Sequence, residues 1–339
     1  MVKTNTRKII RSAIVGYGGK FGMGRHHITS MKDTGFFEPI AVCDVDPAAR
    51  DQAKTDYPEI ETYDCVETML RQADFDLVTV VLPHNLHASI GLKCLRAGKH
   101  TILEKPMCLT VREADAMIRA SKEAGLTLSV FHCRHWDGDI QAMLEVIEKG
   151  LLGEVFHVES FLGNYGHPGT WWRADKTISG GMLYDWGAHF IYSLLCLIPK
   201  RIKSVSGFYH KRVWHDVSNE DQTHVTIHFE GGAVGDLQFS NIAHVAKPRW
   251  RILGTKGGIE DRGGDGSFTV RTQVADYPAE MKVNHHGTDW SPFYQNVAAH
   301  IMSNEPLVIT PERARRVIAV IEYSERSSKV GRPMKLPHE

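Results

Sequence analysis

A glycine cluster directly after the first strand-like segment sets the tightest limit on the fold. Residues 16–24 read GYGGKFGMG and lie between a β-rich run at 9–15 and a segment at 25–34 that can form a helix. Glycines at such a turn let the backbone approach a pyrophosphate, and the following helix N-terminus offers free N–H groups. This arrangement predicts a dinucleotide site. The expected contacts are Gly16 and Gly18 in the first two positions, with Gly22 or Gly24 as the third glycine across a longer loop.

An acidic residue stands where the second strand of such a fold would end. Asp44 follows the short strand-like run 39–43 and lies twenty residues after Gly24. Its carboxylate can accept hydrogen bonds from both ribose hydroxyls of NAD and would repel the additional phosphate of NADP. The alternative is a merely glycine-rich turn with an unrelated strand-end aspartate, but strand, helix and acid occur together here. We therefore predict that the cofactor is NAD.

The chain changes its pattern near residue 134. Before that point strand-like and helix-like segments alternate, and the apolar run Leu77 to Leu82 is typical of a parallel strand buried on both faces. After it, strand-like segments follow one another, which favours an open, mostly antiparallel sheet. We predict a doubly wound Rossmann domain over 1–134 and an α/β domain for substrate binding and oligomerisation over 135–339. The C-terminal helix is able to pack back on the first domain.

Composition limits the partners and the compartment. The chain has 40 Lys and Arg against 40 Asp and Glu, and this zero net charge argues against nucleic acid or an anionic membrane as the main partner. The N-terminal apolar stretch makes a poor signal peptide, no run is long enough to span a bilayer, and six scattered cysteines lack a CxxC pair. We expect a cytoplasmic protein that acts on a small molecule. An open sheet with exposed aromatic and apolar positions would need covering, so we also expect a homo-oligomer, either a dimer or a tetramer.

Two strand ends of the first domain carry residues that can face a cofactor. One strand ends in the sequence Pro83-His84-Asn85-Leu86-His87, and the next in Glu104-Lys105-Pro106. Ligands in such folds bind beyond the carboxyl ends of the strands. For Lys105 taken alone, a solvated strand-end lysine is the better interpretation. The predicted cofactor contacts at these ends are Pro83, His87, Glu104 and Lys105.

A third motif, YDWGAH, lies on a predicted helix over 181–197. Asp185 and His189 are four residues apart, so they share a helix face, and Gly187 between them removes side-chain bulk that would keep a ligand away. A histidine can take a hydroxyl proton at neutral pH as hydride leaves the carbon, and a neighbouring carboxylate can orient it or bind a second hydroxyl. The alternative for this pair alone is a helix-stabilising contact or a buried core histidine.

These motifs together resemble the glucose-fructose oxidoreductase, inositol dehydrogenase and rhizopine-catabolism family, Gfo/Idh/MocA. The similar stretches are the glycine-rich turn with Asp44, the segment LVTVVLPHNLHASIGLKCLRAGKHTILEKP, GLLGEV, GGMLYDWGAHFI and, more weakly, PFYQNV with the terminal helix. The resemblance implies a Rossmann domain, an open-sheet domain that often mediates oligomers, and a sugar or cyclitol substrate. It also implies a catalytic set that maps onto Lys105, Asp185 and His189.

Aromatic and basic residues ahead of the YDWGAH motif are candidates for substrate binding. Tyr165, Trp172 and Arg173 can stack on a sugar ring or bind its hydroxyls, with core or interface packing as an equal alternative. With Lys105, Asp185 and His189 they complete the predicted substrate site. No metal is expected, because the spacings of His132, Cys133, His135 and His285-His286 fit no zinc pattern.

The sequence as a whole predicts an NAD-dependent oxidoreductase that moves a hydride to or from a secondary alcohol carbon of a sugar, cyclitol or glycoside. His189 would act as the general acid/base, with Asp185 beside it, and Lys105 would polarise the substrate oxygen. One alternative is a redox-neutral enzyme that keeps NAD bound, for glycosidic bond elimination or hydride transfer between sugars. A second alternative is a sensor of NAD and sugar without catalysis.

Overall fold

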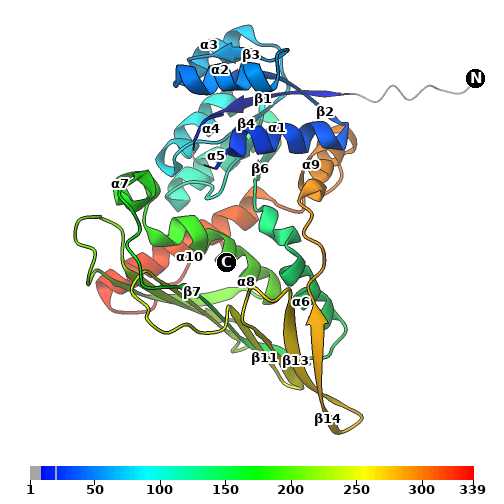
Figure 1. Ribbon diagram of the computed structural model, residues 1–339, viewed down its shortest axis with the longest axis vertical. Helices are drawn as coiled ribbons and strands as arrows, with labels where there is room; N and C mark the ends of the chain where they lie inside the picture. Colours follow the sequence, from blue (N-terminus) through cyan, green and yellow to red (C-terminus); the bar gives the residue numbers. More distant parts are fainter. Residues whose placement is uncertain (1–8, 20) are drawn as a thin grey trace, which may run out of the picture. The chain divides into compact units, whose positions relative to one another are not determined.

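Six parallel strands form the first of two sheets. In the computed structural model, which describes residues 9–19 and 21–339, the strand order is β3-β2-β1-β4-β5-β6 (Figure 1). The strands are β1 Ile10–Val15, β2 Phe37–Cys43, β3 Glu61–Tyr63, β4 Leu77–Val80, β5 His100–Leu103 and β6 Leu128–Val130. The connecting helices are α1 Met23–Thr34, α2 Pro47–Asp56, α3 Val66–Gln72, α4 His87–Arg96 and α5 Val111–Ala124. The predicted Rossmann sheet is confirmed.

The three central strands β1, β4 and β5 form the core of this sheet. Ile14, Val78 and Ile102 have no exposed surface, because helices cover both faces of a parallel sheet. Residues 1–8, the beginning of the N-terminal stretch that we interpreted as a poor signal peptide, lie outside the described residues. All three strands end at the same edge, since parallel strands share their direction, and this edge carries the glycine-rich turn, Pro83 and Lys105.

The second sheet has eight strands in the order β14-β13-β12-β11-β7-β10-β9-β8. Its strands are β7 Val155–Gly163, β8 Ile202–His210, β9 Gln222–Phe229, β10 Val234–Ser240, β11 Trp250–Gly254, β12 Gly257–Asp261, β13 Ser267–Val274 and β14 Tyr277–Asn284. The two strands β7 and β10 pair in parallel, and the other neighbours are antiparallel. Helices α6 (Gly138–Glu148), α8 (Ala188–Leu197) and α10 (Pro311–Val330) gather on one face (Figure 1). The predicted open, mostly antiparallel sheet is confirmed.

The opposite face of the second sheet is mostly polar. Strand β9 alternates strictly: Val225 and Ile227 are buried, whereas His224 and His228 point the other way and are partly exposed. Cross-strand ion pairs such as His224 with Asp236 cover this face, together with Arg251 with Glu159 and Arg271 with Glu280. The sheet nevertheless carries exposed aromatic and apolar side chains, as expected: Phe156 on β7, Phe208 on β8, Val274 on β13 and Tyr277 on β14. Assembly into a homo-oligomer stays a prediction.

Each compact unit of the chain is built from separate segments. The first contains Met1–Cys108, Arg112–Phe131 and Trp290–Ala314, and the second contains Leu109–Val111, His132–Asp289 and Arg315–Glu339. This division differs from a single cut between residues 134 and 135. Helix α9 (Ser291–Ser303) belongs to the first unit because it packs on α1, and most of α10 belongs to the second. The first residues of α10, 311–314, belong to the first unit, and the packing of this helix on the Rossmann domain stays a prediction.

Two further observations concern membranes and thiols. Within the described residues, no helix combines the length and the apolar character that a membrane span requires. Four of the six cysteines, at positions 43, 94, 108 and 133, have buried side chains. Burial raises the pKa of Cys43 and of Cys94 to about 12. These two thiols therefore behave as small core residues rather than as nucleophiles.

Candidate active site

The glycine-rich turn brings the ends of β1 and β4 into close approach. Gly16 has a φ of 92°, and a Cβ atom there would lie 1.9 Å from the carbonyl oxygen of Val81. Gly24, in the first turn of α1, packs against the turn itself: its Cβ would lie 2.6 Å from Cα of Tyr17. Gly22 instead has a φ of 59° and open space around it. Gly24 therefore takes the close-packing role of the third glycine, and Gly22 supplies the turn into the helix.

Asp44 braces this turn. Its Oδ2 accepts hydrogen bonds from the backbone N–H groups of Tyr17 (2.8 Å) and Gly18 (2.9 Å), and Oδ1 accepts one from Asp46 (2.9 Å). A Cβ on Gly18 would lie 2.9 Å from Cβ of Ala49, so this position also excludes a side chain. A carboxylate has about four lone-pair sites, so acceptor capacity remains for ribose hydroxyls. The free space over Gly22 and the α1 N-terminus fit a dinucleotide pyrophosphate.

His87 has a different role from the one predicted. Its ring has no exposed surface, and its two nitrogens lie 2.6 Å from the carbonyl oxygen of Pro106 and 2.8 Å from that of Leu82. Burial lowers the pKa of His87, although the contacts with the two carbonyls oppose this effect. The ring thus ties together the two segments that follow β4 and β5, rather than offering a nitrogen to a cofactor. Pro83 directly precedes the short helix η1 (His84–Leu86), and its contact with the cofactor stays a prediction.

Glu104 anchors a buried network that the sequence did not reveal. Its Oε1 lies 3.2 Å from Nε2 of His27, whose Nδ1 lies 2.7 Å from the hydroxyl of Tyr294 on α9. Burial raises the pKa of Glu104, but His27 and Lys105 outweigh burial, so the net pKa is lowered. Glu104 Oε2 also accepts the backbone N–H of Lys105 at 2.9 Å. Glu104 therefore fixes the backbone that carries Lys105, and its contact with the cofactor stays a prediction.

The segment with Asp185 is wound as a π-helical turn, η4 (Leu183–Gly187), that continues into α8. Within the predicted helix over 181–197, a π-helical turn is thus followed by an α-helix. A Cβ on Gly187 would lie 2.6 Å from Cδ2 of Leu183. Gly187 therefore lets the turn pack on itself, and the approach of a ligand to this position stays a prediction. Single π-helical turns are frequent at functional sites, and this one carries Asp185.

Asp185 forms an ion pair with Arg173, which comes from the short helix η3 (Trp172–Ala174). The guanidinium lies 4.8 Å from the ring centre of Trp172 and 5.5 Å from that of Trp171. Only about a fifth of each charged side chain is exposed. The aromatic rings and the carboxylate together fix Arg173 in place.

This ion pair lines a cavity of the second unit with a volume of about 430 Å³, which we call the large cavity. The cavity lies at the carboxyl ends of the parallel strands β7 and β10. Its lining residues are Leu162, Gly163, Asn164, Pro168, Trp171, Arg173, Ala174, Met182, Asp185, Trp186, Asn219, Phe239, Ser240 and Asn241. The size is within the range of small-molecule sites. Asparagines and tryptophans dominate its polar and aromatic surface, which suits a ligand with many hydroxyl groups.

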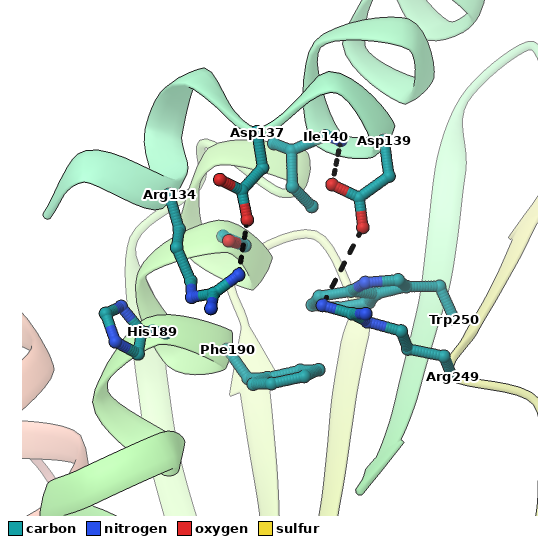
Figure 2. A pocket seen from close by; sticks show the side chains of 9 residues that line it. Arg134, Asp137, Asp139, Ile140, His189, Phe190, Arg249 and Trp250 are labelled. Carbon is teal, nitrogen blue, oxygen red and sulfur yellow. Dashed lines mark hydrogen bonds and ion pairs between the residues drawn. The ribbon is translucent and has the colours of Figure 1, made fainter. Parts of the chain in front are cut away.

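His189 lines a neighbouring small cavity of the same unit, with a volume of about 10 Å³ (Figure 2). The side chain is buried, with 8% exposed, and its ring lies 6.0 Å from the ring of Trp186, which lines the large cavity. Figure 2 shows Arg134 beside His189, with its guanidinium 2.6 Å from Asp137. The space is about that of one water molecule. Trp186 is therefore a neighbour of His189 and, at the same time, lines the large cavity together with Asp185.

The structure sorts the predicted substrate residues into two groups. Arg173 and Asp185 line the large cavity, whereas Trp172 supports Arg173 and Tyr165 lies just outside. The three asparagines Asn164, Asn219 and Asn241 were missed, because they belong to segments that meet only in the fold. Their sequence signal is weak: two of them closely follow strand-like runs.

His132, one of the residues whose spacing fits no zinc pattern, stacks its ring on that of Tyr192, with the ring centres 4.6 Å apart.

Family comparisons agree with this architecture. Residues 10–132 match the model "Oxidoreductase family, NAD-binding Rossmann fold", and residues 140–260 match the GFO/IDH/MocA C-terminal domain. An uncharacterized oxidoreductase of Schizosaccharomyces pombe is 30% identical over 257 residues, which cover 73% of this chain and 68% of the relative. The scyllo-inositol 2-dehydrogenase (NADP(+)) IolW of Bacillus subtilis is 27% identical over 314 residues, covering 85% and 86%.

A solved structure gives the same result for the whole chain. An NAD-binding protein from Listeria innocua superimposes with a TM-score of 0.85 at 25% identity, covering 98% of both chains. The braced glycine turn, the open sheet and the two family matches all point the same way. The chain belongs to the Gfo/Idh/MocA family of oxidoreductases, with an NAD-binding Rossmann domain.

Proposed function

We propose that this oxidoreductase is an NAD-dependent dehydrogenase of a neutral sugar, cyclitol or glycoside. The observation that carries the proposal is the charge balance of the 430 Å³ cavity. Of its described lining residues, Arg173 and Asp185 are the charged ones, and they pair with each other. The remaining polar groups are mainly amides, which both donate and accept hydrogen bonds as hydroxyl-rich ligands require. An uncharged polyhydroxyl compound matches these groups best.

The residues of the chain supply the acid–base and electrostatic parts of the reaction. Bound NAD supplies the hydride acceptor. We propose that His189 takes the proton of the reacting hydroxyl, and that the Lys105 ammonium stabilises negative charge as it develops on that oxygen. Asp185, held by Arg173, would accept a hydrogen bond from a second hydroxyl and so orient the substrate. In this assignment the ion pair positions the substrate, and His189 is the general base.

The test is a screen of neutral sugars, cyclitols and glycosides with added NAD, followed by NADH absorbance. We expect turnover with at least one neutral compound, and a much weaker response to the corresponding sugar acids and sugar phosphates. Protein that binds NAD but forms no NADH with any of these compounds would contradict the proposal and favour a sensor.

The cofactor preference depends on Asp44. We expect NAD to bind more tightly than NADP by about one to two decades, because a charged hydrogen-bond site contributes roughly 1.5–3 kcal/mol. The relative from Bacillus subtilis is named as an NADP(+) enzyme, so family membership alone does not fix this preference. Calorimetric titration of both cofactors measures the ratio.

Two variants separate the charge of Asp44 from its neighbourhood. Asp44→Asn should reduce the ratio of NAD affinity to NADP affinity, since the amide no longer repels the NADP phosphate. Asp46→Asn is the matched control, because Asp46 caps α2 through the backbone N–H of Ala48 and asparagine is an equally good cap. Tighter NADP than NAD binding by the unaltered protein would show that the assignment of Asp44 is wrong.

A further inference from the structure

Three segments that line the large cavity continue outward into one exposed group of aromatic rings. Asn164, Asn219 and Asn241 belong to the lining, and each has an aromatic neighbour in its own segment. These neighbours are Tyr165, Trp214 and His244, which we call the aromatic platform. The platform thus lies directly beyond the rim of the cavity.

The stacked pair in the platform is Tyr165 with His244. Their ring centres are 3.9 Å apart, and the ring planes meet at 19°. Backbone hydrogen bonds hold the two segments together: Ala243 N–H donates to Asn164 O, and Gly166 N–H donates to Asn241 O, both at 3.1 Å. The position of the stack is therefore fixed by the same backbone that shapes the rim.

Trp214 completes the platform from a third segment. Its ring centre lies 5.6 Å from that of Tyr165, and its indole N–H donates to the carbonyl oxygen of Asn241 at 3.1 Å. The segment that carries Trp214 is anchored by the buried carboxylate of Asp221, which accepts the backbone N–H groups of Arg212 and Val213. The indole is therefore fixed before any compound binds.

Exposure separates the platform from ordinary core packing. Tyr165 leaves 47% of its surface exposed although it is stacked, and His244 is also exposed. A preorganised, exposed aromatic surface binds the C–H face of a sugar ring or an aryl ring at little entropic cost. At its edge, Nε2 of His167 lies 2.9 Å from Oδ2 of Asp216, so this ring nitrogen is already engaged by a carboxylate.

We propose that the aromatic platform is an outer binding subsite for a second, uncharged ring joined to the reacting sugar. The preferred substrate is then a glycoside with a sugar or aryl aglycone, rather than a free monosaccharide or cyclitol. This inference rests on the proposed function, because it assigns the reacting ring to the adjacent cavity. The glycosidic linkage would cross the rim formed by the three asparagines.

The experiment measures binding of matched glycosides by calorimetry in the presence of NAD. The probes are the methyl and para-nitrophenyl glycosides of glucose, galactose and mannose, in both anomeric forms. At least one para-nitrophenyl glycoside should bind more tightly than its methyl partner by about two- to tenfold, the range for an aromatic stack. Tyr165→Ala should abolish this preference, whereas Tyr165→Phe should retain it.

Phe208→Ala is the matched control, because Phe208 is an exposed aromatic residue on β8, away from the lining of the cavity. Equal binding of both glycosides of every sugar, no binding of any probe, or an equal loss in Phe208→Ala would overturn the subsite. A Tyr165→Ala protein that still prefers the para-nitrophenyl glycoside, but whose molar mass in light scattering differs from that of the unaltered protein, would also overturn the subsite. In that case a second copy of the chain would cover the platform. NADH absorbance in the same samples tests the dehydrogenase separately: aryl preference without NADH contradicts the proposed function alone.

Discussion

Replacing His189 by alanine is expected to lower the rate of hydride transfer by about two to four decades, the usual contribution of a general base. The affinity for NAD should barely change, because the glycine turn and Asp44 belong to the other unit of the chain. The measurement is single-turnover NADH formation with the best compound from the screen. His189→Gln, which fills more of the buried space, should lose the rate to the same extent.

Controls distinguish chemistry from folding. His189 is buried, so each variant must first keep the melting temperature and NAD affinity of the unaltered protein. His224→Ala, on the partly exposed polar face of the second sheet, is the matched control and should leave the rate unchanged. Near-normal hydride transfer in a folded His189→Ala protein would remove His189 from the mechanism and make Lys105 the candidate acid–base group.

Lys105 variants complete this test. Lys105→Ala should also slow hydride transfer, because the ammonium no longer stabilises the developing oxyanion. Lys105→Arg should not restore the rate, since a planar guanidinium is a poor substitute for a compact ammonium. A fully active Lys105→Arg protein would show that the position requires only a positive charge.

Replacing Gly16 by alanine is expected to lower the free energy of unfolding by about 2–5 kcal/mol and to abolish NAD binding. Two costs add: a left-handed backbone costs an L-residue roughly 1–2 kcal/mol, and overpacking costs roughly 1–3 kcal/mol. The overpacking arises because the new Cβ would meet the carbonyl oxygen of Val81 at 1.9 Å. Denaturant unfolding and NAD calorimetry measure the two effects.

Gly19→Ala is the control for this prediction. Gly19 also has a positive φ, of 100°, but nothing lies within 4 Å of its Cβ position. Gly19→Ala should therefore show only the conformational cost of roughly 1–2 kcal/mol. Equal losses in the two variants would mean that the ends of β1 and β4 do not approach as closely as the structure shows.

The sequence alone determined features that depend on neighbours along the chain. Alternating segments and the apolar run at Leu77 predicted the parallel sheet, because a strand covered on both faces must be apolar throughout. The glycines with Asp44 predicted the NAD site, because the tight turn and the acidic strand end are local requirements. Asp185 and His189 were identified from their spacing and from the resemblance to a family.

Only the tertiary structure decided which groups meet across long separations. Gly24 rather than Gly22 packs on the turn, both ring nitrogens of His87 lie at backbone carbonyl oxygens, and Arg173 is the ion-pair partner of Asp185. The cavity is lined by asparagines from three distant segments, and residues 290–314 return to the first unit. Periodicity and turn signals fix the local backbone, whereas these contacts follow from how the finished elements pack, which no local pattern encodes.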